Sequence, residues 1–366
     1  MQLFKVENKA DFKAFLKVPQ LLYHGNPDWN NFLTRDLEKA VWDNSSYRTS
    51  SWILTKNHQL VGRIAAFVPH NLGKAGIGFF ECIDDQDAAN TLFDAAVKWF
   101  NGQDQKRILA PINAGDRDRF WGLMIGDPRP ASYGENYHPK YYQNLFLNYG
   151  FTEEYTQHTP RIDLTQDSLI AMRPLLNRLK ARYKWEFHTF KVDQLETFVS
   201  DFTEVYNDAW KHNPQYVPLH LEQVKELFKE MKPVLDPDLI YFAYRDSRPI
   251  AFFVALPDIN PLLRKTGYSG GLLFKLKWLW YRKKVTLPIA KGLIFGVVES
   301  EQNKGVLLAL ADSFYQGVVK LNRYRWLELS WIGSFNPKML SFVSRLKAKP
   351  HKFHRTYSLD INNRIT

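Results

Sequence analysis

The stretch LFKVENKADFKAFLKVPQLLY (residues 3–23) returns in the second half of the chain as EFHTFKVDQLETFVSDFTEVY (residues 186–206). In both copies, a short run that alternates in polarity, typical of a strand, precedes apolar residues at helical spacing. A strand and a helix that recur in this way indicate that one folding unit is present twice in the chain.

The segments that follow these openings also correspond, in the same order. SWILTKNHQLVGRIAAFVP (51–69) and LIYFAYRDSRPIAFFVALP (239–257) each contain two apolar runs split by a polar turn, the pattern of a hairpin. A buried strand follows in each half, GFFECID (78–84) or GLIFGVVES (292–300), and then an amphipathic helix. The rest of each half reads as strand, helix and strand: RILAPIN, HPKYYQNL and RIDL in the first, WLELSWI, NPKMLSFV and YSLDI in the second. The pattern predicts two α/β units with mixed sheets that arose by internal duplication.

The length of 366 residues also favours two domains. We expect an N-terminal domain at residues 1–166 and a C-terminal domain at residues 185–366. Residues 167–184 have helical periodicity and many basic residues, which predicts a helical linker. The second half alone carries an insertion, residues 261–291.

Composition narrows the classes of function. The formal net charge of +11 favours anionic partners such as phosphorylated cofactors, nucleic acids or anionic lipids. The first residues carry charges where a signal peptide has an apolar core, and no apolar run reaches about 18 to 20 residues, so we expect a cytoplasmic protein. One cysteine, Cys82, and ten histidines without metal-ligand spacing predict no metal site. His351 and His354 fall in PHKFHR, a basic stretch that we interpret as an edge strand.

The insertion at 261–291 contains no acidic residue, while basic residues alternate with apolar and aromatic ones. Basic residues beside exposed aromatic ones suit an anionic membrane surface, tRNA or a phosphorylated ligand. The alternative is that the apolar residues cover the core and the lysines are solvated.

The turn ESEQNKGV (299–306) joins the second buried strand to a helix. A helix N-terminus offers unpaired backbone N–H groups and a partial positive charge, which suit a diphosphate, and Gly305 allows the backbone to approach closely. Lys304 adds positive charge. The corresponding turn of the first half, DDQDAAN (84–90), carries three aspartates, which would repel a diphosphate. We therefore expect cofactor binding in the second half and not in the first.

This turn resembles the coenzyme A loop of the GNAT superfamily, which runs Arg or Gln, two residues of any kind, Gly, any residue, and Gly or Ala. Gln302 and Gly305 match that pattern, and Leu307 stands where Gly or Ala is usual. Over most of the chain, recurring segments resemble a bacterial family of tandem GNAT-like proteins of undefined substrate. They are GRIAAF, GFFECIDD, APIN, WGLMI, YHPKYY, NYGF, YVP, KPVLDP and ELSWI.

The resemblance implies that acetyl-CoA or another acyl-CoA lies between two splayed central strands. The cofactor-binding residues that it implies are Val297, Val298, Gln302, Asn303, Lys304, Gly305, Val306 and Leu307. Acyl transfer to an amine needs a base, and Glu299, at the end of the central strand, is where GNAT enzymes often present one. Glu328, on the next strand, is the second candidate. The tyrosine that many GNAT enzymes use as an acid is replaced by Phe342 or Val343.

Three functions follow as hypotheses. The first is an acyl-CoA-dependent N-acyltransferase with its site in the C-terminal domain and a small-molecule or peptide amine as acceptor. The second is a Fem-like aminoacyl transferase that uses charged tRNA, bound through the basic insertion. The third is a non-catalytic ligand-binding protein of the same fold, which the missing tyrosine and Leu307 favour.

Overall fold

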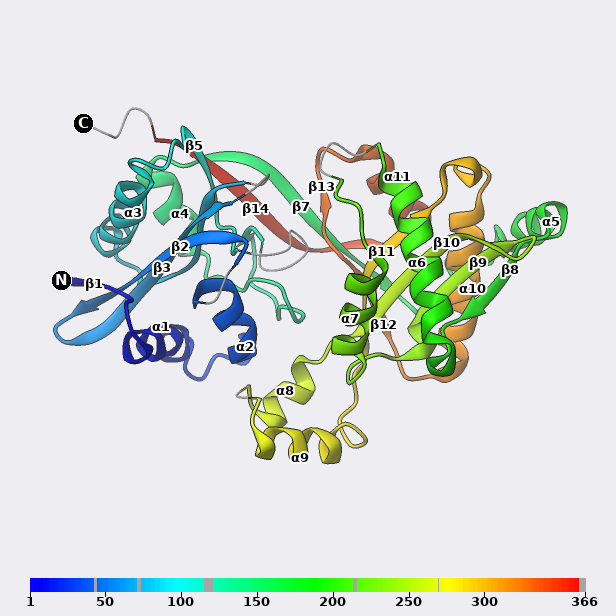
Figure 1. The fold of residues 1–366 in the computed structure, drawn as a ribbon, viewed down its shortest axis with the longest axis horizontal. Helices are drawn as coiled ribbons and strands as arrows, with labels where there is room; N and C mark the ends of the chain where they lie inside the picture. The colour runs from blue at the N-terminus through cyan, green and yellow to red at the C-terminus, as the bar shows by residue number, and fades with distance from the viewer. Residues whose placement is uncertain (43–44, 71–73, 115–120, 213–215, 269, 362–366) are drawn as a thin grey trace.

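The computed structural model describes residues 1–366 except 43–44, 71–73, 115–120, 213–215, 269 and 362–366. It contains two α/β units whose strands form one continuous mixed sheet (Figure 1). The fold that the repeat predicts is therefore confirmed.

The first half of the chain forms one set of helices and strands. In chain order they are β1 (Gln2–Lys5), α1 (Lys9–Leu22), α2 (Thr34–Leu37), the π-helical turn η1 (Glu38–Trp42), β2 (Tyr47–Lys56), β3 (Gln59–Pro69), β4 (Gly76–Cys82), α3 (Gln86–Phe100), β5 (Arg107–Ala110), β6 (Leu123–Ile125), α4 (Tyr141–Tyr149) and β7 (Thr152–Asp163). The predicted hairpin, buried strand and later helices of this half all lie within these bounds.

The second half repeats this order and adds three helices, α7, α8 and α9. Its elements are α5 (Arg173–Tyr183), β8 (Glu186–Thr189), η2 (Val192–Gln194), α6 (Leu195–Trp210), α7 (Leu221–Met231), η3 (Pro237–Leu239), β9 (Ile240–Arg245), β10 (Arg248–Pro257), α8 (Asn260–Thr266), α9 (Leu272–Tyr281), β11 (Ile289–Val297), η4 (Glu299–Glu301), α10 (Val306–Leu321), β12 (Trp326–Leu329), β13 (Ile332–Gly333), α11 (Pro337–Arg345) and β14 (Lys349–Asp360). The predicted insertion thus forms α8 and α9.

The two hairpins occupy equivalent positions and turn in the same way. The loop of β2–β3 places Asn57 and His58 at positive φ, and that of β9–β10 places Asp246 and Ser247 there. Two consecutive residues at positive φ are typical of the two-residue hairpin turn whose twist matches the flanking strands. The polar turn between the two apolar strands of each hairpin therefore has the same structure in both units.

The last strand of each half is exchanged between the units. The order across the sheet is β1-β2-β3-β4-β5-β14-β7-β12-β11-β10-β9-β8. β14, from the end of the chain, pairs with β5 of the first unit, and β7, from the first half, pairs with β12 of the second. β7 and β14 also pair with each other, so both run between the units in Figure 1. The domain boundary at residue 166 stays a prediction, because the last strand in the sheet of each unit comes from the other half of the chain.

The exchange corrects our interpretation of PHKFHR as an edge strand. His351 and His354 lie on β14, which has β5 and β6 on one side and β7 on the other. A strand in this position is interior; the His354 ring is buried, and the His351 ring lies 3.4 Å from the Glu328 carboxylate.

Helices cover both faces of each unit. In the first unit, α1 packs on one face of the sheet and α3 with α4 on the other. In the second, α6 and α7 cover one face, and α10 covers the other together with α5 and α11. Helix α5 in the predicted linker is thus part of a core, because Leu176 is buried against α10.

We expect that the exchange makes the two halves interdependent. A chain cut after Gln166, between β7 and α5, should give two fragments that co-purify when expressed together, because each supplies the strand that closes the other's sheet. Each fragment expressed alone should aggregate, since it exposes unpaired strand edges. Size-exclusion chromatography of the single and paired fragments is the measurement, and two fragments that each run as folded monomers would contradict the exchange.

Candidate functional site

In the second unit, two parallel strands separate part of the way along the sheet. β11 pairs with β12 from Ile289 to Gly292, whose partner is Leu329. The Ser330 N–H donates to the Gly292 carbonyl at 2.7 Å, and beyond this point β11 continues to Val297 without β12 beside it. The strands thus form a wedge whose vertex lies at Gly292 and Leu329.

The backbone of β11 turns toward this wedge at Val297. The Val298 N–H donates to the Ile250 carbonyl of β10 at 3.0 Å, so the preceding residue directs its N–H and C=O to the opposite side. The Val297 carbonyl accepts a hydrogen bond from Gln302 Nε2 at 3.2 Å. Among the described residues, none accepts from the Val297 N–H across the wedge, which leaves this donor for a ligand.

The equivalent wedge of the first unit is closed by side chains. Ile83 N–H donates to the Val61 carbonyl at 3.0 Å, so Cys82 corresponds to Val297. The Cys82 N–H donates to the Tyr142 hydroxyl at 2.8 Å, and the Tyr141 hydroxyl donates to the Cys82 carbonyl at 2.7 Å. Two tyrosines of α4 thus take the backbone groups that stay available in the second unit.

An apolar pocket lies on one face of the second wedge. It has a volume of about 50 Å³ and is open to solvent. Leu307 and Phe314 of α10, Leu329 of β12, and Met339 and Phe342 of α11 are among its lining residues. Two residues that depart from the GNAT pattern, Leu307 and Phe342, therefore face the same apolar space.

The turn before α10 has the backbone of an anion site. Gly305 is the N-cap of α10 with φ +92°, a conformation that favours glycine, and no side chain caps the helix. Asn303 also has positive φ. Lys304 Nζ lies 3.2 Å from the buried carboxylate of Glu301. Val306 and Leu307 follow in the first turn, so the predicted residues 302–307 do form one loop and helix start.

The starts of the equivalent helices α10 and α3 differ in what lies beside them. A Cβ atom on Gly305 would lie 3.2 Å from Leu179 of α5, which packs beside the turn. In the first unit, the Asp85 carboxylate caps α3 by accepting from the N–H groups of Asp87 and Ala88 at 3.0 and 3.1 Å. The helix start of the first unit therefore already holds an anion of its own.

A second, much smaller cavity, of about 10 Å³, lies on the opposite face of the wedge. Its lining comes from both units: Trp121, Gly134, Glu135, Thr159, Lys291, Ser330, Trp331 and His354. Ser330 and Leu329 are consecutive, and successive strand residues point to opposite faces. The apolar pocket and this polar cavity therefore lie on opposite faces of the sheet, next to the vertex of the wedge.

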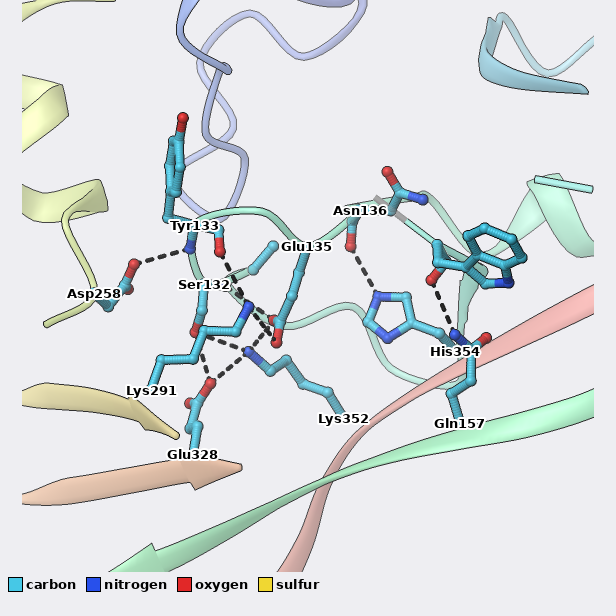
Figure 2. A network of polar contacts seen from close by, with 12 residues as sticks. Ser132, Tyr133, Glu135, Asn136, Gln157, Asp258, Lys291, Glu328, Lys352 and His354 are labelled. Carbon is cyan, nitrogen blue, oxygen red and sulfur yellow. Dashed lines mark hydrogen bonds and ion pairs between the residues drawn. The ribbon is translucent and has the colours of Figure 1, made fainter. Parts of the chain in front are cut away.

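Glu328 is the centre of a charged network beneath the polar cavity (Figure 2). Its carboxylate accepts from Arg161 through two nitrogens, from Lys352 Nζ at 2.7 Å and from Ser132 Oγ at 2.6 Å. Burial favours the neutral acid, but Lys352, His351 and Arg161 hold the pKa of Glu328 well below its usual range. A carboxylate so fully bound is a weak base, so its geometry suits positioning better than proton transfer.

Glu135 connects the network to the cavity. Its carboxylate pairs with Lys352 and, at 3.2 Å, with Lys291. Burial alone would raise the pKa of Glu135, but these two ammonium groups outweigh it and lower the pKa to about 2. Figure 2 shows all three side chains converging below the loop that carries Ser132. Glu135 therefore offers a permanent negative charge in the wall of the cavity.

His354 is held as a neutral ring with one free nitrogen. Its Nε2 lies 2.9 Å from the Asn136 carbonyl, which can only accept, so Nε2 carries the proton. Burial lowers the pKa of His354 more than the Glu135 carboxylate raises it. Among the described residues no donor reaches Nδ1, and a neutral imidazole with its other nitrogen fixed in this way suits a general base.

Glu299 lies elsewhere. It is exposed at the start of η4 and pairs with Lys211 of the α6 end at 2.8 Å. The hydrogen bond from Lys211 lowers the pKa of Glu299. It lines neither cavity and is not brought together with Glu328, and its role as a base stays a prediction.

The strand order and the two separating parallel pairs define a tandem GNAT-like fold. A tandem GNAT protein from the clavulanic acid biosynthesis pathway has a TM-score of 0.58 at 10% identity, over 99% of each chain. A GCN5-related N-acetyltransferase from Sphaerobacter thermophilus has a TM-score of 0.54 at 10% identity, over 98% of this chain and 96% of that one. The glucosamine N-acetyltransferase region of a fungal multi-domain GH3 β-N-acetylglucosaminidase gives 0.59 at 14% identity, over 98% of this chain and 38% of that longer chain.

Two relatives match along almost the whole sequence. Protein YghO of Escherichia coli K12 is 26% identical over 389 residues, which covers 97% of this chain and 94% of YghO. The bacterial ceramide synthase of Caulobacter vibrioides is 22% identical over 379 residues, which covers 98% of this chain and 97% of that enzyme. No family model matches the chain.

Sequence reasoning missed most of the polar cavity. Glu135, Lys291 and His354 come from a loop and two strands that are distant in the sequence, and none belongs to a motif. A signal was present at Lys291, which is a charged residue on a strand whose neighbours are largely apolar. A buried charge of this kind requires a partner.

We predict that Glu135→Gln lowers the free energy of unfolding by about 3 kcal/mol near neutral pH, because the pKa of Glu135 is depressed to about 2 in the folded protein. The sign follows from the depressed pKa: the stabilisation is complete above the ordinary glutamate pKa of about 4.3 and is lost as the pH falls toward 2. Urea midpoints of wild type and variant should therefore converge from pH 5 downward. Glu222→Gln, at an exposed position, is the control, and a difference that does not depend on pH would contradict the assignment.

Proposed function

We propose that the protein is an acyl-CoA-dependent N-acyltransferase whose donor and acceptor meet at the wedge of the second unit. The observation that carries this proposal is the separation of β11 and β12 at Gly292 and Leu329, with an apolar pocket on one face and a polar cavity on the other. The pantetheine arm would bring the thioester carbonyl to the vertex from one side, and the amine would approach this carbonyl from the other side.

The donor side is formed by the predicted loop. The pantetheine arm would lie along the Val297 backbone, whose N–H faces the wedge, beside Val298. The diphosphate would lie at the uncapped start of α10, where Gln302, Asn303, Lys304, Gly305, Val306 and Leu307 form the turn and the first helical residues. The acyl chain would enter the apolar pocket lined by Leu307 and Phe342.

The acceptor side is formed by the polar cavity. An amine beside the Glu135 carboxylate would first lose one ammonium proton to solvent, and His354 Nδ1 would take a second proton from the nitrogen as it attacks. The free amine nitrogen attacks the thioester carbon, and the new C–N bond forms as the C–S bond breaks. The Ser330 hydroxyl, buried without a partner among the described residues, would donate to the oxyanion. The proton held by His354 leaves with the coenzyme A thiolate, so the base is regenerated.

The first unit would bind no acyl-CoA. Its wedge backbone is occupied by Tyr141 and Tyr142, and its helix start is occupied by the Asp85 carboxylate, which also pairs with Lys56 at 2.7 Å. We propose that this unit serves to shape the acceptor cavity, to which it contributes Trp121 and the loop with Glu135.

The name of one relative agrees with this reaction class. A ceramide is an N-acylated long-chain amine, so the name of the Caulobacter vibrioides relative describes amide formation on an amine. We propose an amine acceptor for this chain on the same ground, supported by the carboxylate in its cavity.

We predict that Gly305→Asp reduces coenzyme A binding by at least about a hundredfold, since it places a negative charge at the diphosphate position. Gly305→Asn is the matched control, because asparagine has the same shape, tolerates positive φ and adds no charge. Isothermal titration calorimetry with coenzyme A measures both, and Asp85→Gly should leave binding unchanged. Equal binding by the aspartate and asparagine variants would remove the diphosphate from this turn.

We predict that His354→Asn lowers kcat by about 10² to 10⁴, the usual contribution of a general base, and leaves coenzyme A affinity unchanged. Because burial lowers the pKa of His354 below 6.5, the wild-type rate should stay on its plateau at pH 7 and fall only at more acidic pH. Steady-state rates with a long-chain amine across pH 5 to 8 test this. An acidic limb that persists unchanged in the variant would assign the base to another group.

A further inference from the structure

Helix α9 exposes an apolar face to solvent. Leu272, Leu273, Leu276, Leu279 and Trp280 are each between 55% and 76% exposed. At about 100° per residue these five side chains fall on one side of the helix. A soluble surface rarely presents so many large apolar side chains together, and such patches mark interaction sites.

The opposite face of α9 accounts for its attachment to the protein. Phe274, Trp278 and Tyr281 pack into a small core with Leu262 and Leu263 of α8. The expectation that the apolar residues of the insertion cover a core therefore holds for this inner face only. The exposed leucines serve no packing role among the described residues of the chain.

Basic residues flank the exposed face on both sides. By helical spacing, Lys275 lies along one flank and Lys277 along the other, and Arg282 and Lys284 follow in the turn directly after the helix. Lys284 Nζ lies 3.5 Å from the centre of the Trp280 ring, so the cation covers the exposed aromatic. With no acidic residue in the insertion, the whole face is apolar at its centre and cationic at its edges.

We propose that α9 is a membrane-interface helix that binds the surface of an anionic phospholipid bilayer. An in-plane helix of this kind buries its apolar stripe at the boundary of the acyl chains, while lysines along its flanks reach the headgroup phosphates. No helix in the described part of the chain is long and apolar enough to cross a membrane, so this contact is peripheral. Figure 1 shows α8 and α9 extending from the body of the protein, where a flat surface can reach them.

A bilayer fits this face better than a nucleic acid does. Base stacking and phosphate contacts use aromatic and basic side chains, and the exposed face has one aromatic residue against four leucines. Leucine side chains contribute to binding only when they leave water, which a lipid interface allows.

The segment that leads into α8 and α9 is also attached to the loop beside the polar cavity. Before α8, Asp258 accepts from the Tyr133 N–H at 2.9 Å, and Asn260 Nδ2 donates to the Ala131 carbonyl at 2.8 Å. These contacts hold the insertion to the loop that carries Ser132 and Glu135. Membrane binding through α9 would therefore bring the acceptor side of the site to the bilayer, although the binding itself does not depend on acyl transfer.

Vesicle co-sedimentation of the full chain tests the proposal. Wild type should pellet with vesicles of equimolar phosphatidylglycerol and phosphatidylcholine and much less with phosphatidylcholine alone. Leu276→Gln, Leu279→Gln and Trp280→Gln combined should weaken binding by about tenfold or more, because they remove the apolar stripe. Lys275→Gln, Lys277→Gln and Lys284→Gln combined should remove the preference for anionic vesicles. Leu21→Gln, Leu147→Gln and Ile170→Gln combined, at other exposed positions, should bind as wild type.

The thermal midpoints of the three variants should match that of wild type, because the replaced side chains are exposed, so lost binding cannot be attributed to unfolding. The proposal is overturned if wild type does not bind the anionic vesicles or if the leucine variant binds them normally. It is also overturned if tRNA binds the protein tightly in a manner that requires the lysines and not the leucines, which would assign the face to nucleic acid.

Discussion

The buried carboxylate of Glu328 joins three strands from distant parts of the chain. It lies on β12 and pairs with Arg161 of β7 and with Lys352 of β14. These are the strands through which the two units exchange their ends. Removal of one partner from such a network leaves an uncompensated buried charge, which typically costs about 3 to 5 kcal/mol. The register of β7 against β14, and with it the position of every residue in the polar cavity, depends on this arrangement.

The two units share one fold but differ in the polarity of the residues that lie beside their wedges. Arg63 and Glu81 form a buried ion pair in the first unit, and the Tyr23 and Tyr142 hydroxyls also donate to Glu81. The register places Phe252 and Gly296 at the corresponding positions of the second unit. A Cβ atom on Gly296 would come within 2.8 Å of the Phe252 ring, so glycine is required there. The first unit thus carries a buried, hydrogen-bonded ion pair where the second unit carries an aromatic ring packed on a glycine.

The sequence predicts the elements well but not which residues the strand exchange brings together, for one physical reason. Hairpins, buried strands and amphipathic helices depend on local periodicity, so β2–β3, β9–β10, α3 and α10 are all found where the pattern predicts them. The strand exchange depends on pairing between β7 and β14, which no local pattern encodes. His354 was therefore interpreted as part of an edge strand, and Glu299 was favoured as a base from its place in a motif. The loop at 302–307 was predictable because the chemistry of a helix start is local.

The exchange also explains why the cavity can be built from both units without a flexible interface. His354 is carried by β14, which is bonded to β5 and β6 on one side and to β7 on the other, and Lys291 lies on β11 inside the second sheet. A catalytic group on an interior strand is held by backbone hydrogen bonds along its length, so its position varies less than that of a loop residue. The Asn136 carbonyl then fixes the ring of His354 from the first unit, while the wedge that it faces belongs to the second. In a chain with two separate sheets these groups would move with the domains, whereas here one continuous sheet fixes the position of His354 relative to Lys291 and the wedge.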